Sequence, residues 1–105
     1  MKGDRLIKVN ELIQHALAER LGEIWDIEGA VATITAVETA PDLKHAVVWV
    51  SLLGEVSEEL LEPIFRELRA VTGRLKLKFT PRLEFRIDHS GEYAEHIERI
   101  FRRLK

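Results

Sequence analysis

The chain contains no cysteine. This absence excludes disulfide bonds, thiolate metal sites and cysteine nucleophiles. The chain also lacks a run of about 18 apolar residues, which a membrane-spanning helix would need. Its N-terminal stretch, MKGDRLIKVNEL, carries charges where a secretion signal has an apolar segment. We therefore expect a cytoplasmic protein that enters no membrane.

Sequence signatures of the common enzyme classes are also missing. No glycine-rich loop follows a strand-like segment, which argues against P-loop and dinucleotide sites, and no serine has the flanking glycines of a nucleophile elbow. The four histidines form no i, i+4 pair with a nearby glutamate, as zinc proteases require. Asp88 and His89 could join a metal site, but the surface end of a strand is the favoured interpretation. We predict a protein that is not an enzyme and that uses no metal or cofactor.

The length of 105 residues and the apolar content of 46% suit one globular domain over residues 1–105. A chain of this size buries about 65% of the surface that its unfolded form exposes. One hydrophobic core can form in it, but not two. We expect a monomer.

Apolar residues at spacings of three and four predict a helix over Arg5–Ile24, with Asp4 as its N-cap. A second helix is expected after Ser57, which is placed as its N-cap. It ends near Gly73, where a glycine can take the left-handed conformation. Pro63 lies inside this pattern and predicts either a kink or the first turn of a new helix.

Two runs rich in β-branched residues predict strands at about Ala30–Glu38 and His45–Leu52. Proline cannot donate to a strand ladder, so Pro41-Asp42 marks the turn between them. A third strand is expected over Arg82–Asp88. Both tryptophans could stack on bases. Trp49 lies mid-strand among valines, so we expect it in the core, whereas Trp25, in a loop, is left open between packing and contact with a partner.

Two further segments complete the sequence of elements. Arg74–Phe79 alternates basic and apolar residues, as a strand does, yet it could equally continue the preceding helix. Ser90 can cap a last helix, whose apolar stripe contains Tyr93, Ile97, Ile100, Phe101 and Leu104. The order α-β-β-α(kinked)-β-α predicts a two-layer α+β domain with a three-stranded sheet. The first two strands should pair antiparallel, and the third, after a helical crossover, should lie parallel to one of them.

Charge is unevenly distributed along the chain, although the net charge is only −2. Glu55, Glu58, Glu59 and Glu62 form an acidic block. The following segment is basic and can hold phosphates, although a solvated face is the plainer interpretation. Its candidate RNA-binding residues are Arg66, Arg69, Arg74, Lys76, Lys78 and Arg82. Arg66 and Arg69 lie one helical turn apart, so both can reach the same surface.

Three blocks of the sequence resemble the ribosome-binding factor A family, and their order and spacing together are specific. The first is Arg5–Leu21, RLIKVNELIQHALAERL, with its VNELI run. The second is the strand pair Thr33–Gly54, TITAVETAPDLKHAVVWVSLLG. The third is Arg74–Ser90, RLKLKFTPRLEFRIDHS, with its basic run, Thr-Pro turn and D-x-S.

The resemblance implies a KH-like domain of type II topology that lacks the usual GXXG loop. It implies binding to the small (30S) ribosomal subunit and its 16S rRNA during late maturation, near the 3′ decoding region. It also implies a role in maturation of the rRNA 5′ end without nuclease activity. With this partner, Arg5, Lys8 and Lys44 become candidate outer contacts to rRNA.

The sequence departs from the family pattern at two places. The family kinks its helix pair with an Ala-x-Gly interruption, and that position falls here near Pro63–Phe65, in a stretch several residues short. The loop Trp25–Gly29 lacks the Asp-Pro-Arg often found there. Pro63 could supply the kink by removing a backbone donor. The alternative function is a protein-interaction module of the same fold without RNA affinity.

Overall fold

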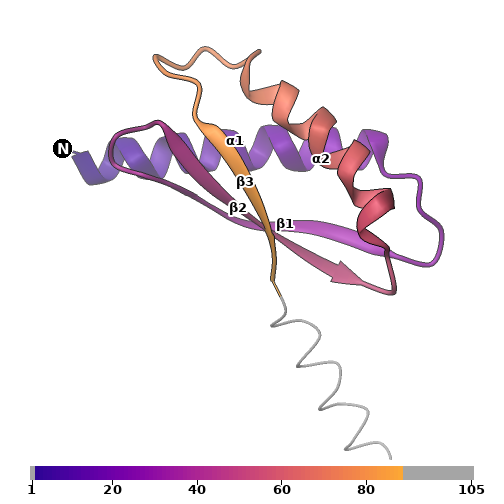
Figure 1. The fold of residues 1–105 in the computed structure, drawn as a ribbon. Helices are drawn as coiled ribbons and strands as arrows, with labels where there is room; N and C mark the ends of the chain where they lie inside the picture. Colours follow the sequence, from indigo (N-terminus) through magenta and orange to yellow (C-terminus); the bar gives the residue numbers. More distant parts are fainter. Residues whose placement is uncertain (1, 89–105) are drawn as a thin grey trace, which may run out of the picture.

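Residues 2–88 are described by the computed structural model and form two helices and a three-stranded sheet (Figure 1). The expected last helix, with Tyr93 and Phe101 in its stripe, lies outside the described residues, and so does His89. The elements in chain order are α1 (Lys2–Ile24), β1 (Val31–Thr39), β2 (His45–Leu53), α2 (Glu58–Thr72) and β3 (Arg82–Ile87). This order confirms the first five elements of the expected arrangement, α-β-β-α-β.

The sheet is mixed, with β2 as its central strand. β1 pairs antiparallel with β2 and β3 pairs parallel with it, which confirms both expectations about strand direction. Residues His45 to Val50 of β2 lie opposite Arg82 to Ile87 of β3. The start of β3 therefore lies beside the turn of the β1–β2 hairpin, where Arg82 N donates to Lys44 O at 2.8 Å.

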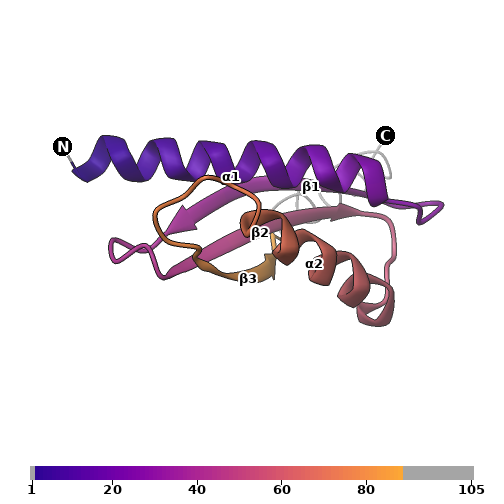
Figure 2. The same ribbon diagram turned by 90° about the horizontal axis from the view of Figure 1, so that it is seen from above.

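Both helices bury apolar residues in one core against the sheet, so the domain has two layers. In Figure 2, α1 lies on the β1 side and α2 lies on the β3 side. The centre of the core is formed by residues with almost no exposed surface, namely Ile13 and Leu17 of α1, Val48 and Val50 of β2, and Leu68 of α2. The apolar stripes expected for the two helices are thus the faces that they bury.

A β-bulge interrupts β1 between Ile34 and Ala36. Ile34 pairs with Val50 and Ala36 with Trp49, so Thr35 is the extra residue. Side chains therefore do not alternate strictly along β1, because an inserted residue shifts the side-chain period by one. The Thr35 hydroxyl donates to Trp49 O at 3.2 Å.

Trp49 does not lie in the core, so the expected placement is wrong. Val48 and Val50, its neighbours in β2, are buried against the helices, and Trp49 is only half-buried. Because successive side chains of a strand point to opposite faces, Trp49 lies on the sheet face away from the helices. The Arg86 guanidinium lies over its ring, with 5.8 Å from Cζ to the ring centroid.

Pro63 lies inside one continuous helix. The residue does not begin a new helix, because α2 already starts at Glu58. Proline has no N–H, so the hydrogen bond that residue 63 would donate to Glu59 O is missing. The amphipathic pattern explains why the helix persists, because Leu61 and Ile64, on either side of the proline, are both buried.

The helix ends differ from the expected caps. α1 begins at Lys2, so Asp4 lies within the helix and is not its N-cap. Ser57 is the N-cap of α2 by position, with extended backbone angles (φ −75°, ψ 151°), but its side chain makes no capping hydrogen bond. Gly73 ends α2 in a right-handed conformation (φ −66°, ψ −17°), so the left-handed cap is wrong.

Tight turns follow α2 and replace that cap. Arg74 N donates to Val71 O at 3.0 Å and Leu75 N donates to Thr72 O at 3.2 Å. These i→i+3 bonds satisfy carbonyl groups at the helix end and carry the chain into a loop. Arg74–Phe79 is consequently neither strand nor helix.

Candidate nucleic-acid interface

Basic residues from four separate parts of the chain come together at one end of the domain. These parts are the first turns of α1, the hairpin turn, the loop after α2 and the start of β3, whereas α2 begins with its glutamates at the other end (Figure 1). We call this region the basic end and define it by Arg5, Lys44, Arg74, Lys76, Lys78 and Arg82. All of these side chains are exposed.

The loop after α2 presents its charges because its leucines hold it to the core. Leu75 and Leu77 are half-buried and pack against the hydrophobic core. The lysine on either side of Leu77 is exposed, as is the arginine before Leu75. The two leucines of this alternating pattern therefore anchor a loop and do not form part of a strand. Phe79 follows with 51% of its surface exposed, and the Lys78 Nζ lies 5.7 Å from its ring centroid.

Arg5 and Lys78 meet at a small cavity beneath this loop. The cavity has a volume of about 40 Å³ and is lined by both residues together with Thr39, Leu43 and Pro81, among others. Leu43 has φ 61°, a left-handed conformation that leucine rarely takes, in the hairpin turn. Arg5 and Lys44, which were expected as outer contacts, thus lie at the basic end together with the lysines of the loop. Lys8 follows Arg5 by one turn of α1 and is also exposed.

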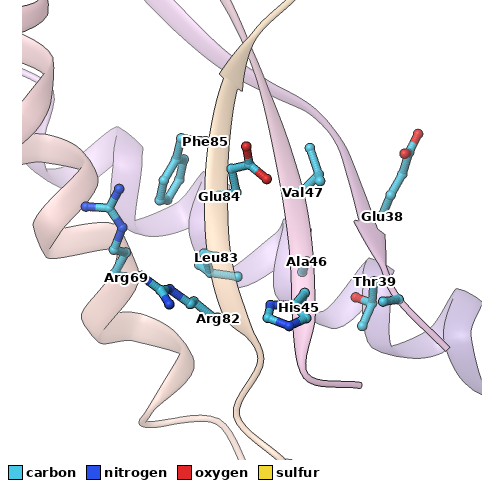
Figure 3. Close-up of a pocket in the computed structure, with 11 residues that line it drawn as sticks. Glu38, Thr39, His45, Ala46, Val47, Arg69, Arg82, Leu83, Glu84 and Phe85 are labelled. Atoms are coloured by element: carbon cyan, nitrogen blue, oxygen red, sulfur yellow. The ribbon is translucent and has the colours of Figure 1, made fainter. Parts of the chain in front are cut away.

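A larger hollow, of about 860 Å³, lies across the start of β3 (Figure 3). Arg69 and Arg82 line it on the α2 side of β3, and the carboxylates of Glu38 and Glu84 line it as well. His45 pairs with Arg82 across the two strands. This hollow therefore carries mixed charge, and phosphates would favour its α2 side.

Stacked rings hold Arg69 in place. The rings of Phe65 and Phe85 stack with 4.6 Å between centroids and 3° between planes. The Arg69 guanidinium lies 5.3 Å from the Phe85 centroid and pairs with Glu62 at 3.5 Å. Such contacts orient a guanidinium at the surface while leaving much of it exposed.

Arg66 and Arg69 line different hollows, although they lie one helical turn apart. About 290 Å³ of open space between α1 and α2 is lined by Arg20, Arg66, Glu67, Ala70 and Arg74. Residues three apart on a helix differ by about 60° in direction. Here that difference is enough to turn Arg66 toward α1 and Arg69 toward β3.

Arg20 was not among the residues predicted from the sequence. It donates to Glu23 at 2.8 Å and to Glu67 of α2 at 3.0 Å. The hydrogen bond to Glu23, with the nearby charge of Glu67, raises the pKa of Arg20 above its ordinary value. Only the pair with Glu23, three residues along the helix, could have been found from sequence spacing.

Trp25 is used for packing in this fold. Its Nε1 donates to Ala30 O at 2.9 Å, and its ring packs against the core. Within residues 2–88, no group of three His, Asp or Glu side chains could hold a metal ion. Of the helices that the structure describes, neither has the length and apolar character needed to cross a bilayer.

Fold and surface together define a small two-layer α+β domain whose basic residues gather at one end. The sequence matches the family model for ribosome-binding factor A over residues 5–101. The chain belongs to this family.

Curated relatives and solved structures agree with this assignment. Ribosome-binding factor A of Opitutus terrae is 37% identical over 105 residues, covering 92% of this chain and 84% of that protein. The protein of the same name from Rhodopseudomonas palustris strain TIE-1 is 41% identical over 107 residues, covering 93% of this chain and 78% of its own.

The crystal structure of ribosome-binding factor A from Thermus thermophilus has a TM-score of 0.61 and 26% identity. That match covers 78% of this chain and 94% of the Thermus chain. A homology model of the Thermus thermophilus factor, fitted into a cryo-EM map of a 30S complex, has a TM-score of 0.62 and 26% identity. It covers 76% of this chain and 91% of the other.

Proposed function

We propose that this protein is a ribosome assembly factor that binds the small ribosomal subunit through its rRNA during late maturation. The similar Thermus factor has been fitted into a map of a 30S complex, which supports the choice of partner. The observation that carries the proposal is the gathering of basic side chains from four separate parts of the chain at one end. Their convergence requires the fold, since Arg5 and Lys78 are far apart in sequence and line one cavity.

Phosphate contacts supply the affinity in this proposal. Guanidinium and ammonium groups neutralise RNA phosphates and release counterions, without reading the bases. Lys76 and Lys78 stand on a loop that Leu75 and Leu77 fix to the core, so their charges are held in position before RNA arrives. Binding then costs less conformational entropy than it would on a free loop.

Phe79 adds a candidate base contact. Its ring is half-exposed in the middle of the basic end, and such a ring can stack on an unpaired base. Phosphate contacts and a stacking ring suit a single-stranded or bulged segment of rRNA. The protein acts by binding and release in the cytoplasm, as a monomer. It promotes maturation of the rRNA 5′ end without cleaving RNA itself.

The salt dependence of RNA binding tests this proposal. If about five phosphates are engaged, a plot of log affinity against log salt has a slope of roughly −4. The double variant Arg74→Gln, Lys76→Gln removes two charges from the basic end, so the slope should become shallower by about 1.5. Arg86→Gln is the control outside the basic end and removes one charge, because Arg86 pairs with Glu84 at 3.2 Å and lies over Trp49.

Two results would contradict the proposal. A salt slope near zero for the wild type would favour the alternative function, a protein-interaction module without RNA affinity. A double variant that binds like the wild type, with the same slope, would remove the basic end from the interface.

A further inference from the structure

The hollow between α1 and α2 is lined by three arginines and one glutamate. Arg66, Ala70 and Arg74 follow one another at steps of four, so they lie along one stripe of α2 and the turn that follows it. The central position of the stripe carries only a methyl group, which leaves open space between two guanidinium groups. In the described part of the chain, neither Arg66 nor Arg74 forms a salt bridge. Both residues are exposed.

One carboxylate within the hollow would oppose an anion. Glu67 lines the same space, and its Oε2 lies 3.0 Å from a guanidinium nitrogen of Arg20. Arg20 also bonds Glu23 at 2.8 Å, on its own helix. The cross-helix ion pair offsets part of the charge of Glu67 and ties its carboxylate to the α1 side of the hollow. The two remaining arginines then dominate the local charge.

We propose that this hollow is a subsite for one phosphodiester group of the bound RNA, with Arg66 and Arg74 as its ligands. Arg20 is a positioning residue, which acts by holding Glu67. The subsite rests on the proposed function, and it extends the footprint from the basic end along the α1 side of α2. Arg74 belongs to both regions and joins them into one path for the RNA backbone.

Filling the hollow without changing its charge is the sharpest test of the subsite. Ala70 is exposed, so Ala70→Leu should fold normally, while its side chain occupies the space between the arginines. Ala70→Ser, at the same position, leaves the space open and is the matched control. With single-stranded RNA as the probe, Ala70→Leu should make the salt slope shallower by about 0.7, the loss of one phosphate contact. Ala70→Ser should leave it unchanged.

A double-mutant cycle tests the role of Arg20. Arg20→Gln should lower RNA affinity about five-fold, the effect of one uncompensated charge roughly 4 Å away in a water-like dielectric. In a Glu67→Gln background the same substitution should have a much smaller effect, because residue 67 then brings no negative charge into the hollow. An equal or larger effect in that background would make Arg20 a direct phosphate ligand and overturn its positioning role. Thermal midpoints measured in parallel separate these changes from loss of fold.

The outcomes distinguish the two proposals. If the wild type binds no RNA at any salt concentration, the proposed function fails and the subsite fails with it. If the wild type binds RNA and Ala70→Leu matches it in affinity and slope, only the subsite is overturned. An NMR titration with inorganic phosphate identifies the source of the anion. Shifts of the Arg66 and Arg74 Nε–H signals that added RNA does not displace would indicate a site for free phosphate, and would overturn the RNA contact.

Discussion

Replacing Pro63 with alanine should stabilise the domain, because Pro63 lies within α2 and not at its start. Proline in a helix interior costs about 3 kcal/mol relative to alanine, through the missing N–H and the clash with the carbonyl four residues earlier. Part of this gain is offset, since alanine gives the unfolded chain more freedom, by about 0.4–1 kcal/mol. A net stabilisation of about 2 kcal/mol follows. For a domain of this size, it corresponds to a rise in melting temperature of about 8–16 °C.

Thermal and urea unfolding, followed by circular dichroism, measure this change. Pro81→Ala is the matched control, because Pro81 is buried and lies outside any helix, directly before β3. That substitution should lower stability, since it removes buried surface and adds freedom to the unfolded chain. A loss of stability in Pro63→Ala would refute the reasoning. It would mean that the packing of Leu61 and Ile64 depends on the backbone shape that the proline imposes.

Two further predictions concern single residues. Gly54 has φ 93°, and a Cβ at this position would collide with the carbonyl oxygen of Gly29. Gly54→Ala should therefore lower the free energy of unfolding, measured in urea, by at least about 1–3 kcal/mol. Gly22→Ala is its control, because nothing lies near that position; equal stability of the two variants would contradict the expected strain. Phe79→Ala should lower affinity for single-stranded RNA by about 1–3 kcal/mol, the value of one stacked base, with little change in melting temperature. Unchanged affinity would exclude Phe79 from the interface.

The strands and helices could be predicted because their patterns are local. Val48 and Val50 alternate with Val47 and Trp49, and this period identified β2 without any tertiary information. The period could not say which of the two sets faces the helices. Hydrophobicity favoured Trp49 for the core, but the core has room for the valine set, and Trp49 is covered by Arg86 instead.

Features that depend on a distant neighbour could not be predicted. The bulge at Thr35 exists only in the pairing with β2, and Arg74–Phe79 lacks a strand partner although it alternates as a strand would. The sequence predicted the basic residues individually, and only the fold shows which of them lie close together. Arg5 joins Lys78, whereas Arg66 separates from Arg69. Arg20 and Glu67 lie 47 residues apart in sequence and pair across two helices, so no local spacing indicates the contact.

Co-sedimentation with ribosomal particles tests the central claim most directly. The wild-type chain, mixed at low salt with purified small subunits and separately with assembled ribosomes, should pellet with the small subunits and remain in the supernatant with the ribosomes. Arg74→Gln, Lys76→Gln should largely stay in the supernatant in both mixtures, while Arg86→Gln behaves as the wild type does. Equal pelleting of the wild type with both particles, or with neither, would contradict the assignment of this protein to small-subunit assembly.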